Sequence, residues 1–380
     1  MKTKRLDYLI VGPALPYRGG ISKTNHSLSK SLITFGKKVE IWTFKSLYPD
    51  FFFPGKSQYE EKEEETNLII KRIFNTSNPL LWQKNIKSII KLNPSFIVFR
   101  YWTPYLSPLY STIAKNLPKS IKKIALVDNW IPHEKGILDT FLNKNFGRKI
   151  DYFVTFSKNV TEQITKNGFS NILTGFHPIN SNLPKKISKK NAYNKLNLSS
   201  NYKYVLFFGI IRKYKGLDLL IRSFSEKIIR ESNIKLIIVG EFYKNKNKYY
   251  NLINKLNLKS RIIIIPEYVN EETARDYFCL ADLVAQTYIS SSQSGVTAMS
   301  YNYKVPLLVT KINGLKDPIE VDKTGVVSNL NTKSISKSII QILEKNNQKD
   351  IIDNIKKVCH NYHWDKFSYK LLNFINESEL

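Results

Sequence analysis

Short apolar runs alternate with longer amphipathic segments from one end of the chain to the other. In the first half these runs cover residues 7–11, 38–43, 68–72, 96–100, 123–127 and 152–156. In the second half they cover residues 204–208, 235–239, 261–265, 283–286 and 306–310. Such an alternation is typical of α/β units, in which helices connect the strands of a parallel sheet. It predicts an α/β protein.

The alternation is interrupted once, at residues 181–200, which are polar and basic and contain no strand pattern. A length of 380 residues is also too great for one small module. We therefore expect two similar α/β domains, at residues 1–180 and 181–362. Residues 363–380 read as a C-terminal helix.

The composition excludes several classes of protein. Hydrophobic residues make up 42% of the chain and aromatic residues 13%, which is enough for real cores and argues against a disordered or fibrous chain. The only cysteines are Cys279 and Cys359, so neither a disulfide framework nor a structural zinc site is expected. No run reaches the ~18 apolar residues of a membrane span. We expect a cytoplasmic protein, soluble or peripheral to a membrane.

The charge balance is strongly basic. The chain has 59 Lys and Arg against 31 Asp and Glu, a net charge of +28, which favours phosphates, acidic lipid surfaces or nucleic acid as partners. No recognition-helix, zinc or RNA-platform motif supports nucleic-acid binding, so we expect none. Within a helix predicted at residues 79–93, Lys84, Lys87 and Lys91 would suit an anionic bilayer, or would simply be solvated.

Three loops contain residues suited to binding an anion. The first is residues 12–21, where Gly19-Gly20 precedes a helix and leaves backbone N–H groups open to a phosphate. The second follows residues 204–208, where Gly209 is followed by Arg212 and Lys215, cations that suit a diphosphate. The third is the serine-rich loop at residues 287–295, which leads into a helix at residues 297–303. Each loop alone is also compatible with an ordinary turn.

Taken together and in this order, the loops resemble those of retaining nucleotide-sugar glycosyltransferases of the GT-B fold, of the family-four (glycosyl transferases group 1) type. Residues 208–216 match the strand–Gly–Arg–Lys-Gly motif of that family, and residues 238–241 resemble the strand ending in glycine that follows. Residues 313–317 and 323–325 are similar to its later glycine-rich and basic turns. The resemblance spans nearly the whole chain and is specific in its second half.

The resemblance implies two Rossmann-like domains facing each other across a cleft, with the last helix crossing back to the first domain. Arg212 and Lys215 would stabilise the departing diphosphate. The other residues expected to bind the donor are Gly19, Gly20, Gly209, Ser292, Gln293, Ser294, Gly295, Val296 and Ser300, with Glu241 and Tyr268 on the nucleobase side. The enzyme would be a hexosyltransferase that needs no metal and no cofactor, because the UDP- or GDP-linked sugar is a co-substrate.

The sequence departs from the family at two positions. The family usually has Glu, seven residues and Glu at this loop, where this chain has Ser292 and Ser300 within and after the sequence SQSGV. Serine can form hydrogen bonds with a sugar or ribose but supplies no charge. We interpret this as a variant enzyme. The alternative is a non-catalytic protein of the same fold that binds nucleotide sugars or glycans.

The acceptor is expected to bind the first domain. Family members usually have a histidine there, at a position occupied here by Asp128, while His133 lies on the same loop. Either residue could act near the reacting carbon, Asp128 as a general base and His133 as a catalytic or acceptor-binding group. The expected acceptor is a saccharide or lipid-linked saccharide in surface polysaccharide assembly, on the inner face of the plasma membrane.

Overall fold

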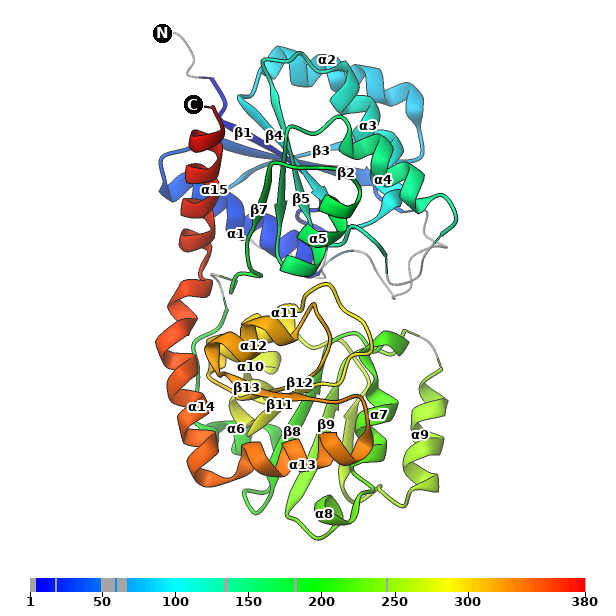
Figure 1. Ribbon diagram of the computed structural model, residues 1–380, viewed down its shortest axis with the longest axis vertical. Helices are drawn as coiled ribbons and strands as arrows, with labels where there is room; N and C mark the ends of the chain where they lie inside the picture. Colours follow the sequence, from blue (N-terminus) through cyan, green and yellow to red (C-terminus); the bar gives the residue numbers. More distant parts are fainter. Residues whose placement is uncertain are drawn as a thin grey trace. The chain divides into compact units, whose positions relative to one another are not determined.

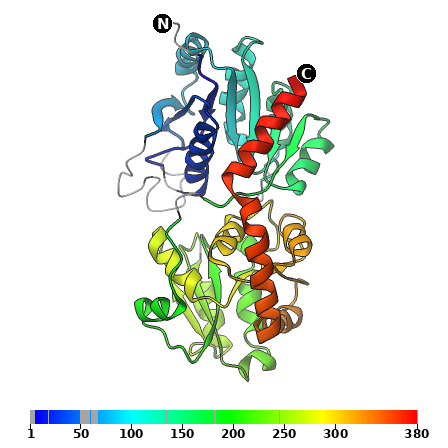
Figure 2. The same cartoon turned by 90° about the vertical axis from the view of Figure 1, so that its left-hand side faces the viewer.

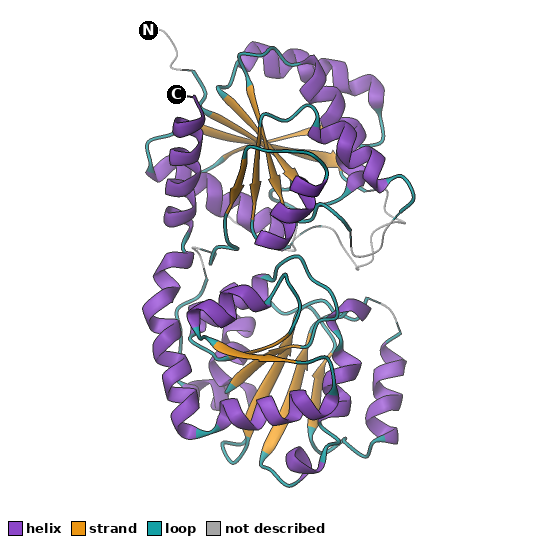
Figure 3. Ribbon diagram, viewed as in Figure 1, coloured by secondary structure: helices purple, strands orange, loops and turns teal. Residues whose placement is uncertain are grey.

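The computed structural model describes residues 5–17, 19–48, 59, 67–132, 136–180, 183–243 and 245–379. The chain divides into two units, each with its own parallel sheet (Figures 1 and 3). Unit 1 comprises Met1–Asn180 and Trp364–Leu380, and unit 2 comprises Ser181–His363. His133 and residues 51–56 and 60–65 lie outside the described part of the chain.

The sheet of unit 1 has seven strands in the order β3-β2-β1-β4-β5-β6-β7, and every pairing is parallel. The strands are β1 (Tyr8–Val11), β2 (Val39–Ser46), β3 (Ile69–Asn75), β4 (Phe96–Tyr101), β5 (Lys122–Val127), β6 (Tyr152–Thr155) and β7 (Ile172–Thr174). β1 lies between β2 and β4. From β1 the strand order runs through β2 and β3 to one edge of the sheet, and the strands from β4 onward run to the other edge. This is the topological switch point at which open α/β sheets bind ligands.

Helices cover both faces of this sheet, and each face has its own apolar core. One core contains side chains of α2 (Trp82–Leu92), α3 (Ser107–Asn116), α4 (Asp139–Gly147) and α5 (Lys158–Lys166). The other contains side chains of α1 (Gly20–Thr34) and α15 (Trp364–Glu379). Two 3-10 turns, η2 (Pro79–Leu81) and η3 (Pro104–Leu106), precede α2 and α3. Burial on both faces explains why most strands are continuous apolar runs.

The C-terminal helix α15 is part of unit 1 although nearly 200 residues separate it from Asn180 (Figure 2). Phe367 is fully buried and stacks on Phe156, with ring centroids 5.3 Å apart. The Ser31 hydroxyl on α1 donates to the carbonyl of Trp364 at 3.0 Å. The helix therefore completes the second core of unit 1.

Unit 2 has a six-stranded sheet in the order β10-β9-β8-β11-β12-β13, again with parallel pairings throughout. Its strands are β8 (Lys203–Phe208), β9 (Ile234–Val239), β10 (Ile262–Ile265), β11 (Leu283–Gln286), β12 (Leu307–Thr310) and β13 (Gly325–Ser328). Its helical elements are α6 (Lys189–Leu196), η4 (Lys213–Lys215), α7 (Leu217–Ser223), α8 (Lys227–Arg230), α9 (Lys246–Lys255), α10 (Glu271–Leu280), α11 (Gly295–Tyr303), α12 (Lys316–Asp322), α13 (Thr332–Leu343), α14 (Lys345–Val358) and η5 (Cys359–Tyr362). The switch point lies between β8 and β11.

The α/β class expected from the sequence is confirmed. All eleven expected strands are present, but the sequence did not predict β7 and β13, the last strand at one edge of each sheet. β7 is only three residues long and half-buried, and β13 begins with glycine, so neither has a conspicuous apolar run. No helix in the described part of the chain is both long and apolar enough to cross a bilayer.

We predict that Phe367→Ala lowers the free energy of unfolding of unit 1 by about 3–5 kcal/mol, because it leaves a cavity in a closed core. Urea denaturation measures this change. Tyr369→Ala is the matched control on the same helix, since that ring is 56% exposed. Equal effects of the two substitutions would show that α15 contributes little to the core.

Candidate functional site

The residues that the sequence singled out in unit 2 follow the carboxyl ends of its strands. Gly209 follows β8, Glu241 follows β9, Tyr268 follows β10 and the serine-rich loop follows β11. Because all these strands are parallel, their carboxyl ends lie at one edge of the sheet. The loops after β8 and β11 flank the switch point itself, which makes this edge the candidate site of unit 2.

The loop after β8 folds back so that Lys215 approaches Gly209. Lys215 is buried, and its Nζ donates to the carbonyl of Phe208 at 3.4 Å. Gly209 has φ 93°, and a Cβ there would lie 3.0 Å from that Nζ. Glycine at 209 therefore serves both the positive φ and the close approach of the lysine.

The ammonium group of Lys215 is held in a poorly solvated place. Burial, with a further contribution from the nearby Arg212, lowers the pKa of Lys215 to about 7. Its Nζ lies 5.5 Å from the ring centroid of Tyr288. Among the described residues, Lys215 has no ion pair with a carboxylate. The site thus holds a buried cation that an anionic ligand could neutralise.

Arg212 is exposed, and its guanidinium lies over the ring of Tyr243, 4.5 Å from the centroid. The loops carrying these two residues are joined by backbone hydrogen bonds. Ile211 N donates to Glu241 O at 2.8 Å, and Tyr243 N donates to Ile211 O at 3.1 Å. Stacking on an aromatic face leaves the N–H groups of an arginine free to bind an anion in the ring plane. The sequence analysis identified Arg212 but not Tyr243.

The loops after β8 and β11 are in direct backbone contact. Gly216 has φ 62°, and a Cβ there would lie 2.0 Å from the carbonyl oxygen of Thr287. The hydroxyl of Thr287 donates to Gly216 O at 3.0 Å, and Ile289 N donates to Tyr214 O at 2.7 Å. No side chain fits at position 216 without separating the two loops.

Tyr288 joins the lysine to the start of α11. Its hydroxyl lies 3.5 Å from the hydroxyl of Ser294, and its ring faces Lys215. Ser294 is the N-cap of α11 and accepts a hydrogen bond from Val296 N. The structure therefore links Lys215, through Tyr288, to Ser294 at the N-cap of α11. The sequence analysis did not single out Tyr288, because what marks this residue is its packing against Lys215 and Ser294 and not its neighbours in the chain.

The two serines that replace the family glutamates have different surroundings. Ser292 is 3% exposed and lies in the loop, where Ser291 donates its hydroxyl to Gln293 O at 2.8 Å. Ser300 is fully buried on α11 and donates its hydroxyl to Val305 O at 2.9 Å. That hydrogen bond closes the C-terminal end of the helix inside the unit. The geometry gives Ser300 a structural role and does not favour the donor contact that the sequence predicted.

Glu241 and Tyr268 lie further along the same edge. The Glu241 carbonyl is part of the pairing with the β8 loop, and the residue is half-buried. Tyr268 follows β10, two strands away from β8, and is 44% exposed. Their expected position on the nucleobase side of a donor stays a prediction.

In unit 1, the glycine loop follows β1 at the switch point. Gly19 is the N-cap of α1 with φ 112°, and Gly20 is the first residue of the helix. Among the described residues, a Cβ on either glycine would meet no atom within 4 Å, so both backbones border open space within that part of the chain. His26 accepts a hydrogen bond from Leu15 N at 3.2 Å, and burial lowers its pKa to about 4. A neutral His26 thus fixes the loop.

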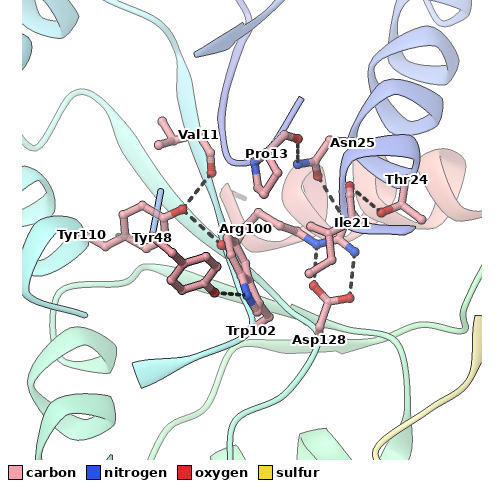
Figure 4. Close-up of polar contacts among 10 residues, drawn as sticks. All are labelled: Val11, Pro13, Ile21, Thr24, Asn25, Tyr48, Arg100, Trp102, Tyr110 and Asp128. Carbon is pink, nitrogen blue, oxygen red and sulfur yellow. Dashed lines mark hydrogen bonds and ion pairs between the residues drawn. The ribbon is translucent and has the colours of Figure 1, made fainter. Parts of the chain in front are cut away.

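Asp128 forms a buried ion pair that the sequence analysis did not anticipate (Figure 4). Its two carboxylate oxygens accept hydrogen bonds from Arg100 Nε and Nη2 at 2.5 and 2.7 Å. Arg100 is 1% exposed and also donates to Asn25, whose amide donates to the carbonyl of Pro13 at 2.8 Å. Two bonds to a guanidinium hold Asp128 as a positioning group for the glycine loop. This geometry does not favour the general-base role.

Among the described residues there is no group of three or more His, Cys, Asp or Glu side chains that could hold a metal ion. His133 lies outside those residues, so its predicted role is untested.

The buried pair of Arg100 with Asp128 had one signal in the sequence. Arg100 ends the apolar run FIVFR, and a charge that ends an apolar strand needs a partner.

A family model matches most of unit 2. Residues 188–358, nearly all of that unit, match the family model described as glycosyl transferases group 1. No curated protein gives a significant match to this chain.

Solved structures resemble the chain over nearly its full length. Sucrose-phosphate synthase from Thermosynechococcus elongatus has a TM-score of 0.77 at 13% identity and covers 98% of both chains. A glycosyltransferase from Rickettsia africae has 0.74 at 17%, covering 98% of this chain and 99% of that one. HepE from Anabaena, in complex with UDP and glucose, has 0.73 at 11%, covering 98% and 100%. Residues 188–358 of unit 2 therefore match the glycosyl transferases group 1 model, and the whole chain has the GT-B fold.

Proposed function

We propose that this protein transfers a hexose from a nucleoside diphosphate sugar to a saccharide or lipid-linked saccharide, with retention of the anomeric configuration. The observation that carries the proposal lies at the switch point of unit 2, where Lys215 lies beside Tyr288 and the Tyr288 hydroxyl lies 3.5 Å from that of Ser294, the N-cap of α11. HepE and a trehalose-6-phosphate protein from E. coli, both similar in fold, are described with UDP or a UDP sugar. These neighbours support a UDP-linked donor, with GDP as the other candidate base.

The proposed chemistry depends on stabilising the leaving diphosphate. As the anomeric bond breaks, negative charge builds up on the phosphate oxygens, and positioned cations and N–H groups lower the energy of that state. Lys215 supplies a point charge and Arg212 a planar fork that can donate two parallel hydrogen bonds. The amides of Gly295 and Val296, at the start of α11, would add neutral donors.

With these groups neutralising the diphosphate, a metal ion is not required, and we propose a metal-independent reaction. Unit 1 would bind the acceptor near the glycine loop that Arg100, Asp128 and Asn25 hold in place. We further propose that the acceptor belongs to surface polysaccharide assembly, and that the protein works at the anionic inner face of the plasma membrane.

A panel of nucleotide sugars tests the proposal. A donor should raise the thermal unfolding temperature, because a ligand that binds only the folded state stabilises it. The same donor should be consumed when an acceptor glycan is supplied, and EDTA should leave the rate unchanged. NMR of the product should show the anomeric configuration of the donor sugar retained. Binding without turnover would favour the non-catalytic alternative, and an inverted product or strict Mg²⁺ dependence would contradict the mechanism.

We predict that Arg212→Ala lowers kcat/KM by at least ~30-fold, equivalent to ~2 kcal/mol of transition-state stabilisation. Lys213→Ala is the matched control, since Lys213 is an exposed cation in the same turn. Steady-state kinetics with the best donor measures both variants. Near-normal kcat/KM for Arg212→Ala, or an equal loss for Lys213→Ala, would refute the role.

We predict that UDP binds more weakly as the pH rises from 7 to 9. The pKa of Lys215 is about 7 in the free protein, so its charge is lost over this range, while a bound diphosphate favours the charged form. The affinity should fall by up to about tenfold per pH unit, measured by titration calorimetry.

Lys215→Met should bind weakly at all pH values and lose this slope. In the wild type, the lowered pKa of Lys215 also makes the unliganded protein more stable as the pH rises from 7 toward 10. In that range the unfolded chain holds the lysine proton and the folded chain does not. A wild-type affinity that is flat with pH would contradict the assignment.

A further inference from the structure

Six of the exposed large apolar side chains of unit 1 lie on segments at one edge of its sheet. Ile137 is 102% exposed, Leu80 88%, Phe141 67% and Leu138 65%, and Leu81 and Tyr105 are also exposed. We call these six residues the apolar rim. They belong to η2, η3 and the start of α4, segments that follow the carboxyl ends of β3, β4 and β5. Large aliphatic groups this exposed indicate a surface that meets an apolar partner.

The segments of the apolar rim are connected to one another. The hydroxyl of Tyr105 lies 3.0 Å from the hydroxyl of Thr76, which precedes η2. η3 and α3 pack against α4, and η2 packs against α2. The helices α2, α3 and α4 share one apolar core, so the elements next to the rim lie on one side of the sheet (Figure 1).

The surroundings of the apolar rim are basic. Lys84, Lys87 and Lys91 are exposed on α2, the helix that begins directly after Leu80 and Leu81. Residues 71–127 contain no Asp or Glu. On α4 the carboxylate of Asp139 accepts a hydrogen bond from Gly136 N at 2.7 Å. The rim therefore combines exposed aliphatic groups with an excess of positive charge.

We propose that the apolar rim and the three lysines of α2 dock this protein on an anionic phospholipid bilayer. The aliphatic groups would enter the boundary between headgroups and acyl chains, and the lysines would contact acidic headgroups. A second copy of the chain is a poorer partner, because a two-fold contact through this surface would set lysines against lysines. The docking surface rests on the proposed function in one respect, because a lipid-linked acceptor would be found at a bilayer.

Vesicle co-sedimentation of the full chain tests the apolar part of the surface. The vesicles are phosphatidylcholine alone, or phosphatidylcholine with one third phosphatidylglycerol. The wild type should bind the anionic vesicles and not the neutral ones. Substituting Ile137→Ser, Leu138→Ser and Phe141→Ser together should weaken binding at least ~10-fold. The matched control is Ile228→Ser, Val321→Ser and Leu330→Ser, three exposed apolar residues of unit 2, and should bind as wild type.

The three lysines are tested against a control triple that changes the net charge by the same amount. Lys84→Glu, Lys87→Glu and Lys91→Glu together should weaken binding by about 100-fold, because each lysine contributes about fivefold at an acidic surface. Lys333→Glu, Lys337→Glu and Lys349→Glu change the net charge equally on exposed positions of unit 2 and should have a much smaller effect.

Three results would overturn the proposal: equal loss in the two lysine triples, equal binding to neutral and anionic vesicles, or a rim triple that binds like the wild type. If the rim triple instead changed the molar mass in solution with unaltered vesicle binding, the rim would be a contact between copies. Donor-induced thermal stabilisation, measured on the same variants, should be unchanged. It separates failure of the docking surface from failure of the proposed function.

Discussion

Backbone contact between Gly216 and Thr287 holds the candidate donor site together. The two residues lie on loops that follow neighbouring strands, β8 and β11, and a Cβ at position 216 would lie 2.0 Å from the Thr287 carbonyl. This contact places the turn carrying Lys215 against the segment carrying Tyr288. The position of the lysine beside Tyr288 depends on it. The site is therefore built on backbone packing, and its side chains occupy places that this packing creates.

The two units treat buried charge in opposite ways. In unit 1, the buried guanidinium of Arg100 is neutralised by Asp128, and both groups are used in holding the glycine loop. In unit 2, the buried ammonium of Lys215 is partnered by a carbonyl and an aromatic ring, and its pKa is lowered to about 7. Burying a charge without a counter-ion is unfavourable, and an anionic ligand would remove that penalty. The difference indicates that Arg100 is structural and that Lys215 is available to a ligand.

Much of the fold could be predicted from the sequence, because a strand buried on both faces must be apolar along its whole length. The strands that escaped prediction, β7 and β13, are edge strands with weaker burial and short or glycine-containing sequences. In the candidate site, Arg212, Lys215 and Ser294 were predicted because cations, glycines and a serine follow the ends of apolar runs, and their roles stay predictions. Ser300 was expected at the donor because of its spacing, and only its burial and its bond to Val305 O revealed a structural role.

Local sequence patterns predict the α/β class, two domains that meet near residue 180, and loops that could bind an anion. Those features depend on local periodicity and on residues close together in the chain. The folded units reveal which charges are neutralised, as in Arg100 with Asp128, 28 residues apart, and which aromatic rings lie beside the cations. They also show that the helix beginning at Trp364, which the family resemblance already assigned to the first domain, completes the second core of unit 1. Such pairings join residues distant in sequence, and no local pattern encodes them because only packing of the whole unit brings them into contact.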